Sequence, residues 1–237
     1  MIAAKESDEL FDWVDGHAYF CRQRVEFREI VLGDHTFNVA ALVDAAGLLD
    51  DDEFAKPFLE EDRAPYGLEL WPAALMLSDY ILQGEPGAGR SALDLGCGVG
   101  LVAMAAARRG WQVTGVDHDP SALRFAQRNA RKNGETQLLF DRFDWKTPFF
   151  GQRFDRVFAA DVLYQRIDHL PILKCIESLL ADGGLAFLAD PNRKVADSFP
   201  ARSRERGFEV TEIKTSATLP SGAAIAGRLY TLSRAAG

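Results

Sequence analysis

The segment LDLGCGVG places an acidic side chain next to a glycine-rich loop, a combination that could bind a cationic ligand. Gly96 and Gly98 carry no side chains, so a ligand can lie against the backbone at both positions. Gly100 lets the loop turn into a helix, whose N-terminus adds amide donors and the positive end of a dipole. Asp94 precedes the loop, where its carboxylate would oppose a phosphate and favour a cationic amino-acid group. The alternative is a plain strand-to-helix turn of an α/β protein.

The next acids favour a nucleoside. The dinucleotide fingerprint GxGxxG is not met, because Leu101 occupies the position of its third glycine. Asp117 ends the predicted strand in VTGVDHD, where α/β nucleoside-binding proteins hold ribose hydroxyls with a carboxylate. Asp119 is better placed to cap a helix that starts at Pro120. His118 would then flank the nucleoside, unless it is simply a surface histidine.

Two further segments bring acids and aromatic rings to the ends of predicted strands. In FDWKTPF, Asp144 could accept a hydrogen bond from an adenine amino group and Trp145 could form a wall of the pocket. A loop acid beside a partly buried ring explains that segment equally well. In FAADVLY, an apolar run ends in Asp161, and Tyr164 follows three residues later. Alone, this pair is more often a loop acid and a packing tyrosine.

Strands and helices alternate from Leu68 onward, which predicts a parallel sheet with helices on both faces. The last two predicted strands have no helix between them and are expected to pair as an antiparallel hairpin. One helix is expected to open at Trp71-Pro72 and to end at Gly84. The other predicted helices cover 100–109, 120–133, 170–180 and 195–206, and the predicted strands cover 91–95, 112–116, 136–140, 154–160, 185–189, 208–214 and 228–233.

The predicted fold is an α/β, Rossmann-like three-layer sandwich with a seven-stranded, mostly parallel sheet and an antiparallel C-terminal hairpin. The ligand is expected at the carboxyl ends of the strands, where their order reverses. We expect a domain over residues 64–237, preceded by a small extension over residues 1–63. Within the extension, VEFREIVLGDHTFNVA predicts a hairpin that turns at Gly33-Asp34, and residues 8–20 are expected to be helical.

Composition excludes several classes of function. The net charge is -8, so a nucleic-acid backbone is repelled on average, and the basic run RFAQRNARKNG is interpreted as a solvated helix face. The three cysteines are far apart and the four histidines lack metal-ligand spacing, which argues against disulfides and a metal site. No segment approaches a membrane span, and the acidic N-terminus is unlike a signal peptide. We therefore expect a cytoplasmic protein without nucleic-acid, membrane or metal partners.

These segments resemble the class I, seven-stranded S-adenosylmethionine-dependent methyltransferases over about residues 66–233. LDLGCGVG is similar to their first motif, GVDHD to their acidic second and FDW to their third. PYGLELWPAALMLSDYI and FDRVFAADVLY resemble more specifically the lysine-methyltransferase-like branch called methyltransferase family 16. ADPNR is similar to the end of the fifth strand in members directed at the electron-transfer flavoprotein β subunit and in bacterial relatives.

The resemblance implies S-adenosylmethionine as cofactor and methyl transfer to an amine, most often a lysine of a protein substrate. It places Asp161 and Tyr164 at the reaction centre. Asp161 would anchor the incoming ammonium, and Tyr164 would offer a hydrogen bond or its ring face to a cation. No residue is singled out as general base. The expected cofactor-binding residues are Trp71, Asp94, Gly96, Gly98, Gly100, Asp117, His118, Asp144, Trp145 and Ala160.

Two alternatives stay open at this point. The acidic composition suits any cationic acceptor, so a small amine or another metabolite is a second candidate substrate. A non-catalytic binding module with a cofactor fold is a third interpretation, and the presence of Asp94, Asp117, Asp161 and Tyr164 argues against it. A nicotinamide-dependent oxidoreductase is disfavoured by the missing third glycine.

Overall fold

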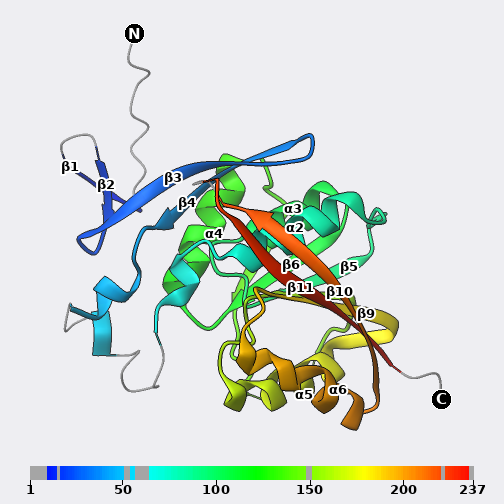
Figure 1. Cartoon of the computed structure of the whole chain (residues 1–237). Coiled ribbons are helices and arrows are strands. Elements are labelled where there is room, and N and C mark those ends of the chain that lie inside the picture. The colour runs from blue at the N-terminus through cyan, green and yellow to red at the C-terminus, as the bar shows by residue number, and fades with distance from the viewer. Residues whose placement is uncertain are drawn as a thin grey trace.

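The computed structural model describes residues 10–14, 17–50, 54–56, 64–147, 151–219 and 222–234, which form two β-sheets (Figure 1). The strands of the larger sheet are β5 (Ser91–Leu95), β6 (Gln112–Asp117), β7 (Leu139–Arg142), β8 (Phe154–Ala160), β9 (Leu180–Asp190), β10 (Phe208–Thr218) and β11 (Ala224–Arg234). Their order is β10-β11-β9-β8-β5-β6-β7, and it reverses between β5 and β8. Strands β5 to β9 pair in parallel, while β10 and β11 form an antiparallel hairpin. The predicted seven-stranded sheet is confirmed.

Helices cover both faces of this sheet, which separates two apolar cores. The helices are α2 (Pro72–Gln83), α3 (Leu101–Arg108), α4 (Pro120–Lys132), α5 (His169–Leu179) and α6 (Phe199–Glu205). Phe158 of β8 packs in one core with Met104 of α3, whereas its neighbours Val157 and Ala159 pack in the other with Ile172 of α5. Because side chains alternate across a strand, an apolar strand such as β8 must be covered on both faces.

Most predicted boundaries agree with the structure, and β5 and β8 agree at both ends. The strands β9, β10 and β11 each extend four or five residues beyond the prediction at one end. The helix predicted over 195–206 is instead a 3-10 turn, η4 (Lys194–Ser198), followed by α6. Pro200 explains this break, because proline has no N–H to donate to the preceding turn. The strand predicted over 136–140 is wrong in its bounds, since the edge strand β7 begins only at Leu139.

The smaller sheet is N-terminal and has the order β1-β2-β3-β4. Its strands are β1 (Asp12–Val14), β2 (His17–Phe20), β3 (Gln23–Leu32) and β4 (His35–Leu42), so the predicted hairpin at Gly33-Asp34 is confirmed. The helix predicted over 8–20 is wrong where the chain is described, because Ala18 and Phe20 alternate with more exposed neighbours and bury one face of β2. The boundary predicted at residue 63 lies outside the described residues.

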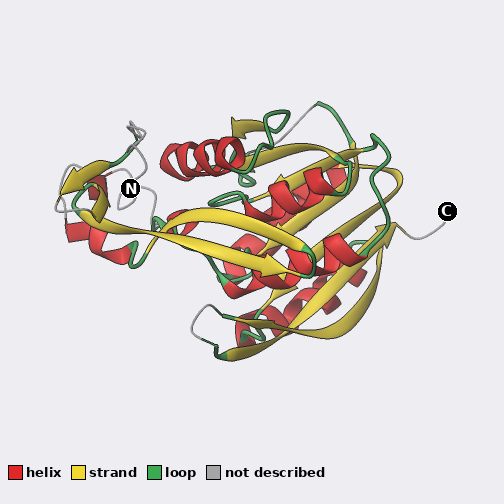
Figure 2. Cartoon of the chain, turned by 90° about the horizontal axis from the view of Figure 1, so that it is seen from above, coloured by secondary structure: helices red, strands yellow, loops and turns green. Residues whose placement is uncertain are grey.

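The long β3–β4 hairpin lies across the helices (Figure 2) and is docked on α4 by two asparagines. Asn129 accepts the N–H of Ala40 and donates to its carbonyl, and Asn133 does the same with Asn38. The two side-chain amides thus pair with β4 as a neighbouring strand would, because residues four apart on a helix share one face.

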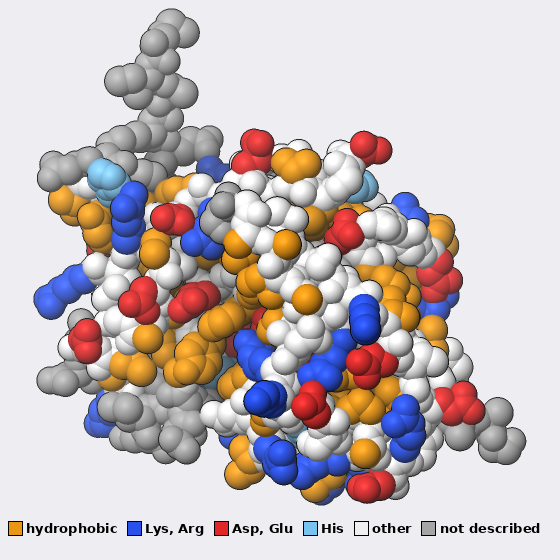
Figure 3. Space-filling model, in the orientation of Figure 1, with side chains coloured by type: hydrophobic (Ala, Val, Ile, Leu, Met, Phe, Trp, Pro, Cys, Tyr) orange, Lys and Arg blue, Asp and Glu red, His pale blue; other side chains and the backbone are white. Residues whose placement is uncertain are grey.

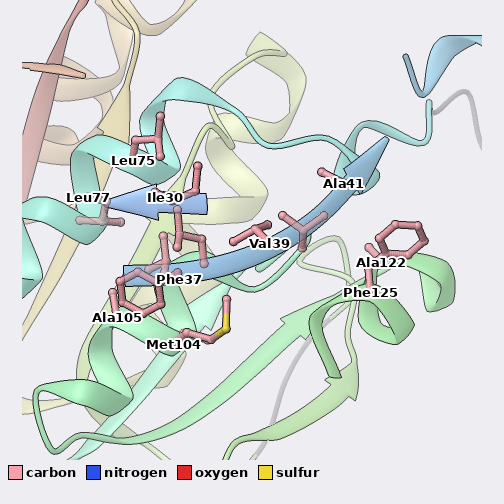
Figure 4. Close-up of a cluster of buried hydrophobic side chains, with 14 of the residues drawn as sticks. Ile30, Phe37, Val39, Ala41, Leu75, Leu77, Met104, Ala105, Ala122 and Phe125 are labelled. Atoms are coloured by element: carbon pink, nitrogen blue, oxygen red, sulfur yellow. The ribbon is translucent and has the colours of Figure 1, made fainter. Parts of the chain in front are cut away.

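The hairpin also shares an apolar core with the helices. Ile30 and Phe37 lie beside Leu77 and Met104 in the close-up of Figure 4, and all four side chains are buried. The hairpin therefore supports α2 and α3, the helices that lead into and out of the glycine loop region.

Candidate active site

A pocket lies at the carboxyl ends of β5, β6 and β8, at the reversal of strand order. The loop after β5, the end of β6 and the segment after β8 all contribute to it, as expected for a parallel α/β sheet. Its lining includes ten of the residues singled out from the sequence, namely Trp71, Asp94, Gly96, Gly98, Asp117, His118, Trp145, Ala160, Asp161 and Tyr164.

Asp94 is fully buried at the floor of this pocket. Its Oδ2 accepts the N–H of Ala103 in the first turn of α3 at 2.9 Å, while its Oδ1 has no hydrogen-bond partner. Burial, and secondarily the nearby charge of Asp117, raises the pKa of Asp94 to about 8. A buried hydrogen-bond acceptor without a partner destabilises the folded protein. A cationic ligand group that binds Asp94 Oδ1 would offset this cost.

Asp117 ends β6 and organises the neighbouring loop. Its Oδ2 accepts the N–H of Gly98 at 2.9 Å, and its Oδ1 accepts the N–H of Asp119 at 3.0 Å and lies 3.2 Å from His118 Nδ1. Oδ2, which accepts only the Gly98 N–H, keeps a further acceptor site, so a ribose hydroxyl can still be bound. Asp119 caps α4 by accepting the N–H of Ser121, as predicted, and burial raises its pKa to about 6.

The two central glycines allow close approach by other parts of the protein. A Cβ at Gly98, whose φ is +50°, would lie 3.0 Å from the carbonyl oxygen of Gly67. A Cβ at Gly96 would lie 2.9 Å from a methyl of Val162 and 3.2 Å from the ring of Trp145. The glycine loop is therefore packed between the turn that contains Gly67 and the segments that follow β7 and β8. The sequence did not indicate these contacts.

Aromatic side chains form the other end of the pocket. The ring of Tyr66, in the 3-10 turn η2 (Tyr66–Leu68), meets those of Trp71 and Tyr164 edge to face at 5.7 and 5.8 Å. Trp71 Nε1 donates to the carbonyl of Tyr66 at 2.8 Å, which fixes the indole plane. Glu69 binds the N–H of Ala45 and so ties this segment to the end of the N-terminal sheet.

Asp161 is buried and both of its oxygens have partners. Its Oδ1 forms an ion pair with Nη1 of Arg193, and its Oδ2 accepts the N–H of Ala73 at 3.3 Å. Ala73 lies in the first turn of α2, so the carboxylate stabilises that helix N-terminus. The φ of Asp161 is +63°, a left-handed conformation that aspartate tolerates better than most residues.

Two residues singled out from the sequence do not line this pocket. Gly100 is the N-cap residue of α3, has a left-handed conformation and packs closely against Ala126 of α4. Asp144 accepts the N–H of Lys146 within its own turn, and its neighbour Trp145 is the residue that reaches the pocket. Trp145 Nε1 and His118 Nε2 are buried there without hydrogen-bond partners.

The sheet order and the acid-glycine loop at its reversal define the class I S-adenosylmethionine-dependent methyltransferase fold. A family model described as a methyltransferase domain matches residues 87–237, and the chain belongs to this family. An S-adenosylmethionine-dependent methyltransferase from Methanosarcina mazei superposes with a TM-score of 0.52 over 63% of this chain and 94% of that one, at 18% identity. Precorrin-6y C5,15-methyltransferase from Geobacter metallireducens gives 0.53 over 67% and 85%, at 14% identity.

Curated relatives at higher identity match a shorter stretch. The ubiquinone biosynthesis O-methyltransferase of Methylocella silvestris is 38% identical over 112 residues, which cover 46% of this chain and 43% of that protein. The protein of the same name from Actinobacillus pleuropneumoniae is 32% identical over 121 residues, covering 48% and 52%. The chain thus spans about half the length of the curated relatives it matches, and these relatives do not support the narrower resemblance to methyltransferase family 16.

The family implies S-adenosylmethionine as cofactor, and the polar groups of the pocket fit this molecule. The unpartnered Oδ1 of Asp94 suits its cationic amino-acid group, and Asp117 suits its ribose hydroxyls. The unpartnered nitrogens of His118 and Trp145 suit the adenine end. None of the helices in the described part of the chain has the length and apolar character needed to cross a bilayer.

Sequence reasoning missed Arg193, the partner of Asp161. It lies 32 residues further along the chain, in the loop after β9. The only available signal was its position in ADPNR, directly after a predicted strand of the same sheet.

Proposed function

We propose that this protein transfers the methyl group of S-adenosylmethionine to a small-molecule acceptor, at a hydroxyl oxygen, rather than to a lysine of another protein. When bound, the cofactor supplies an activated methyl, which exchanges its bond to sulfur for a bond to the acceptor oxygen and leaves S-adenosylhomocysteine. The hydroxyl proton passes to solvent. The chain's own residues must then orient the acceptor and keep both molecules aligned.

The state of Asp161 carries this proposal. A site for a lysine ammonium needs a carboxylate whose charge is available to the substrate. Here the charge of Asp161 is balanced by Arg193, and its second oxygen is engaged by the backbone of α2. An incoming ammonium would gain little from this carboxylate and would be repelled by the guanidinium.

The aromatic end of the pocket and the named relatives support the same acceptor class. Tyr66, Trp71 and Tyr164 present ring edges and faces that suit a flat organic molecule. The relatives from Methylocella silvestris and Actinobacillus pleuropneumoniae are named for O-methylation in ubiquinone biosynthesis.

In this proposal, each residue of the pocket has a definite role. Asp94 binds the cationic end of the cofactor, and Asp117 binds its ribose. Tyr164 and Trp71 contact the acceptor ring, while Asp161 positions the start of α2 and the guanidinium of Arg193.

Fractionation of a labelled reaction tests the acceptor class. The protein is incubated with methyl-labelled S-adenosylmethionine and a cell extract that has been separated by ultrafiltration into small molecules and proteins. We expect label in the small-molecule fraction, dependent on the protein and reduced at least about tenfold by Gly98→Val. Label on a protein lysine instead would overturn the proposal in favour of the lysine-methyltransferase alternative.

A further inference from the structure

Arg193 lies beside the acceptor end of the pocket. Its guanidinium pairs with Asp161, and its Cζ lies 5.8 Å from the centre of the Trp71 ring. Both of these partners line the pocket. Arg193 itself does not line the pocket, so its guanidinium stands at the pocket border, next to Trp71 and Asp161.

The backbone of Arg193 is held on both sides. Its N–H donates to Asp190 Oδ1 at 2.8 Å, and its carbonyl accepts from Arg228 Nη2 at 2.8 Å. The preceding residue, Asn192, has a φ of +60°, a turn conformation that asparagine tolerates. Because the backbone is held and Nη1 is paired with Asp161, the side chain loses little conformational entropy when it binds a ligand.

One edge of the guanidinium is left for a ligand. Nη1 makes both of the side-chain hydrogen bonds that Arg193 forms within the described part of the chain, to Asp161 and, at 3.5 Å, to Asp190. The other two nitrogens of the guanidinium, Nε and Nη2, are not fully buried. About a quarter of the side chain (26%) is exposed, so this edge reaches solvent. The Nε–Nη2 edge is the one that binds a carboxylate through two parallel hydrogen bonds.

We propose that Arg193 recognises a carboxylate, or an equivalent anionic oxygen group, on the acceptor molecule. This rests on the proposed small-molecule methyl transfer and narrows its substrate to an anionic, ring-bearing compound. The aromatic side chains hold the ring, and the guanidinium edge fixes its orientation toward the transferred methyl. In Figure 3, hydrophobic side chains gather near the centre of the visible face, with Lys, Arg, Asp and Glu side chains around them.

Binding of two small probes tests this assignment without any methyl transfer. Benzoate and benzyl alcohol share a ring and differ in charge, and each is titrated by calorimetry into the protein saturated with S-adenosylhomocysteine. We expect benzoate to bind about tenfold or more tightly than benzyl alcohol. Arg193→Gln should remove this preference, and Arg193→Lys, which keeps a charge but not the fork, should retain part of it. Arg166→Gln is the matched control and should leave the preference unchanged.

Equal or undetectable binding of the two probes, or an undiminished preference in Arg193→Gln, would overturn the assignment. If Arg193→Gln does not fold, Arg193→Lys alone tests the assignment. An undiminished preference for benzoate in Arg193→Lys would contradict recognition by the Nε–Nη2 edge of the guanidinium. The labelled small-molecule product gives a second readout: it should be retained by an anion exchanger at pH 7, and a neutral product contradicts the assignment. Absence of any such product contradicts only the proposed function, because the probe titration does not depend on turnover.

Discussion

Asp94 allows a direct test of how the cofactor is bound. The fully buried carboxylic acid has a pKa of about 8, compared with its usual 3.8, chiefly because of burial. At pH 7 about nine-tenths of the free protein therefore carries a proton on this group. A bound cofactor brings a cationic amino-acid group toward the unpartnered Oδ1 and favours the ionised form.

Cofactor binding at pH 7 should therefore release close to one proton. Affinity for S-adenosylhomocysteine, which keeps the same amino-acid group, should rise about tenfold per pH unit as pH approaches 8 and then level off. Calorimetry at pH 7 in two buffers of different ionisation enthalpy measures the number of protons released. Asp94→Asn keeps an acceptor for the Ala103 N–H and should bind more weakly, with no proton release.

The same substitution has an opposite effect on stability. Because the pKa of Asp94 is raised in the folded protein, its stabilising contribution is complete below about pH 3.8 and is lost as pH rises through about 8. The full difference is on the order of 6 kcal/mol, from about 4 pKa units at about 1.4 kcal/mol each. Above pH 8, Asp94→Asn should thus raise the free energy of unfolding measured without cofactor. Unchanged proton release in Asp94→Asn, or none in the natural protein, would refute this account.

Three further substitutions test the loop, the hairpin contact and the adenine end. Gly98→Ala combines a positive φ with a 3.0 Å contact and should lower the free energy of unfolding in urea by about 2–3 kcal/mol. Gly33→Ala has a similar φ, +55°, in open space and should lose only about 1–2 kcal/mol, so equal losses would contradict the contact. Asn129→Asp removes the donors to two backbone carbonyls and should cost about 2–3 kcal/mol in the same assay, and a loss below about 0.5 kcal/mol would exclude the pairing with β4. Trp145→Phe removes the unpartnered buried Nε1 together with one ring of the indole, so it should weaken S-adenosylhomocysteine binding several-fold, whereas full affinity would show that this nitrogen has no ligand partner.

The large sheet could be predicted because its signals are local. Apolar strands, glycine stops and proline starts recur from Leu68 onward, and the predicted bounds of β5 and β8 agree with the structure. The N-terminal sheet was only partly predictable, because a short strand such as β2 is defined by its partner β3 and by which side chains it buries.

Contacts between distant segments account for what could not be predicted. RFAQRNARKNG has the composition of a solvated helix face, yet Arg128 and Asn129 are buried. Arg128 lies 4.8 Å from the Phe27 ring centre, and Asn129 pairs with Ala40, 89 residues earlier. Two asparagines four residues apart are compatible with such pairing, but nothing in the helix itself identifies the strand that they bind.

Asp161 combines the two interpretations that the sequence allowed. It is a loop acid bonded to a backbone amide, since it accepts the N–H of Ala73, and it also lies in the pocket beside the aromatic residues. What decides its chemistry is a third group, the guanidinium of Arg193. Because Arg193 balances the carboxylate and leaves its own outer edge to solvent, the pair places hydrogen-bond donors at the border of the pocket and offers no net negative charge. The free carboxylate that DVLY alone predicts is therefore not available to an amine, and this argues for the proposed anionic acceptor over an amine.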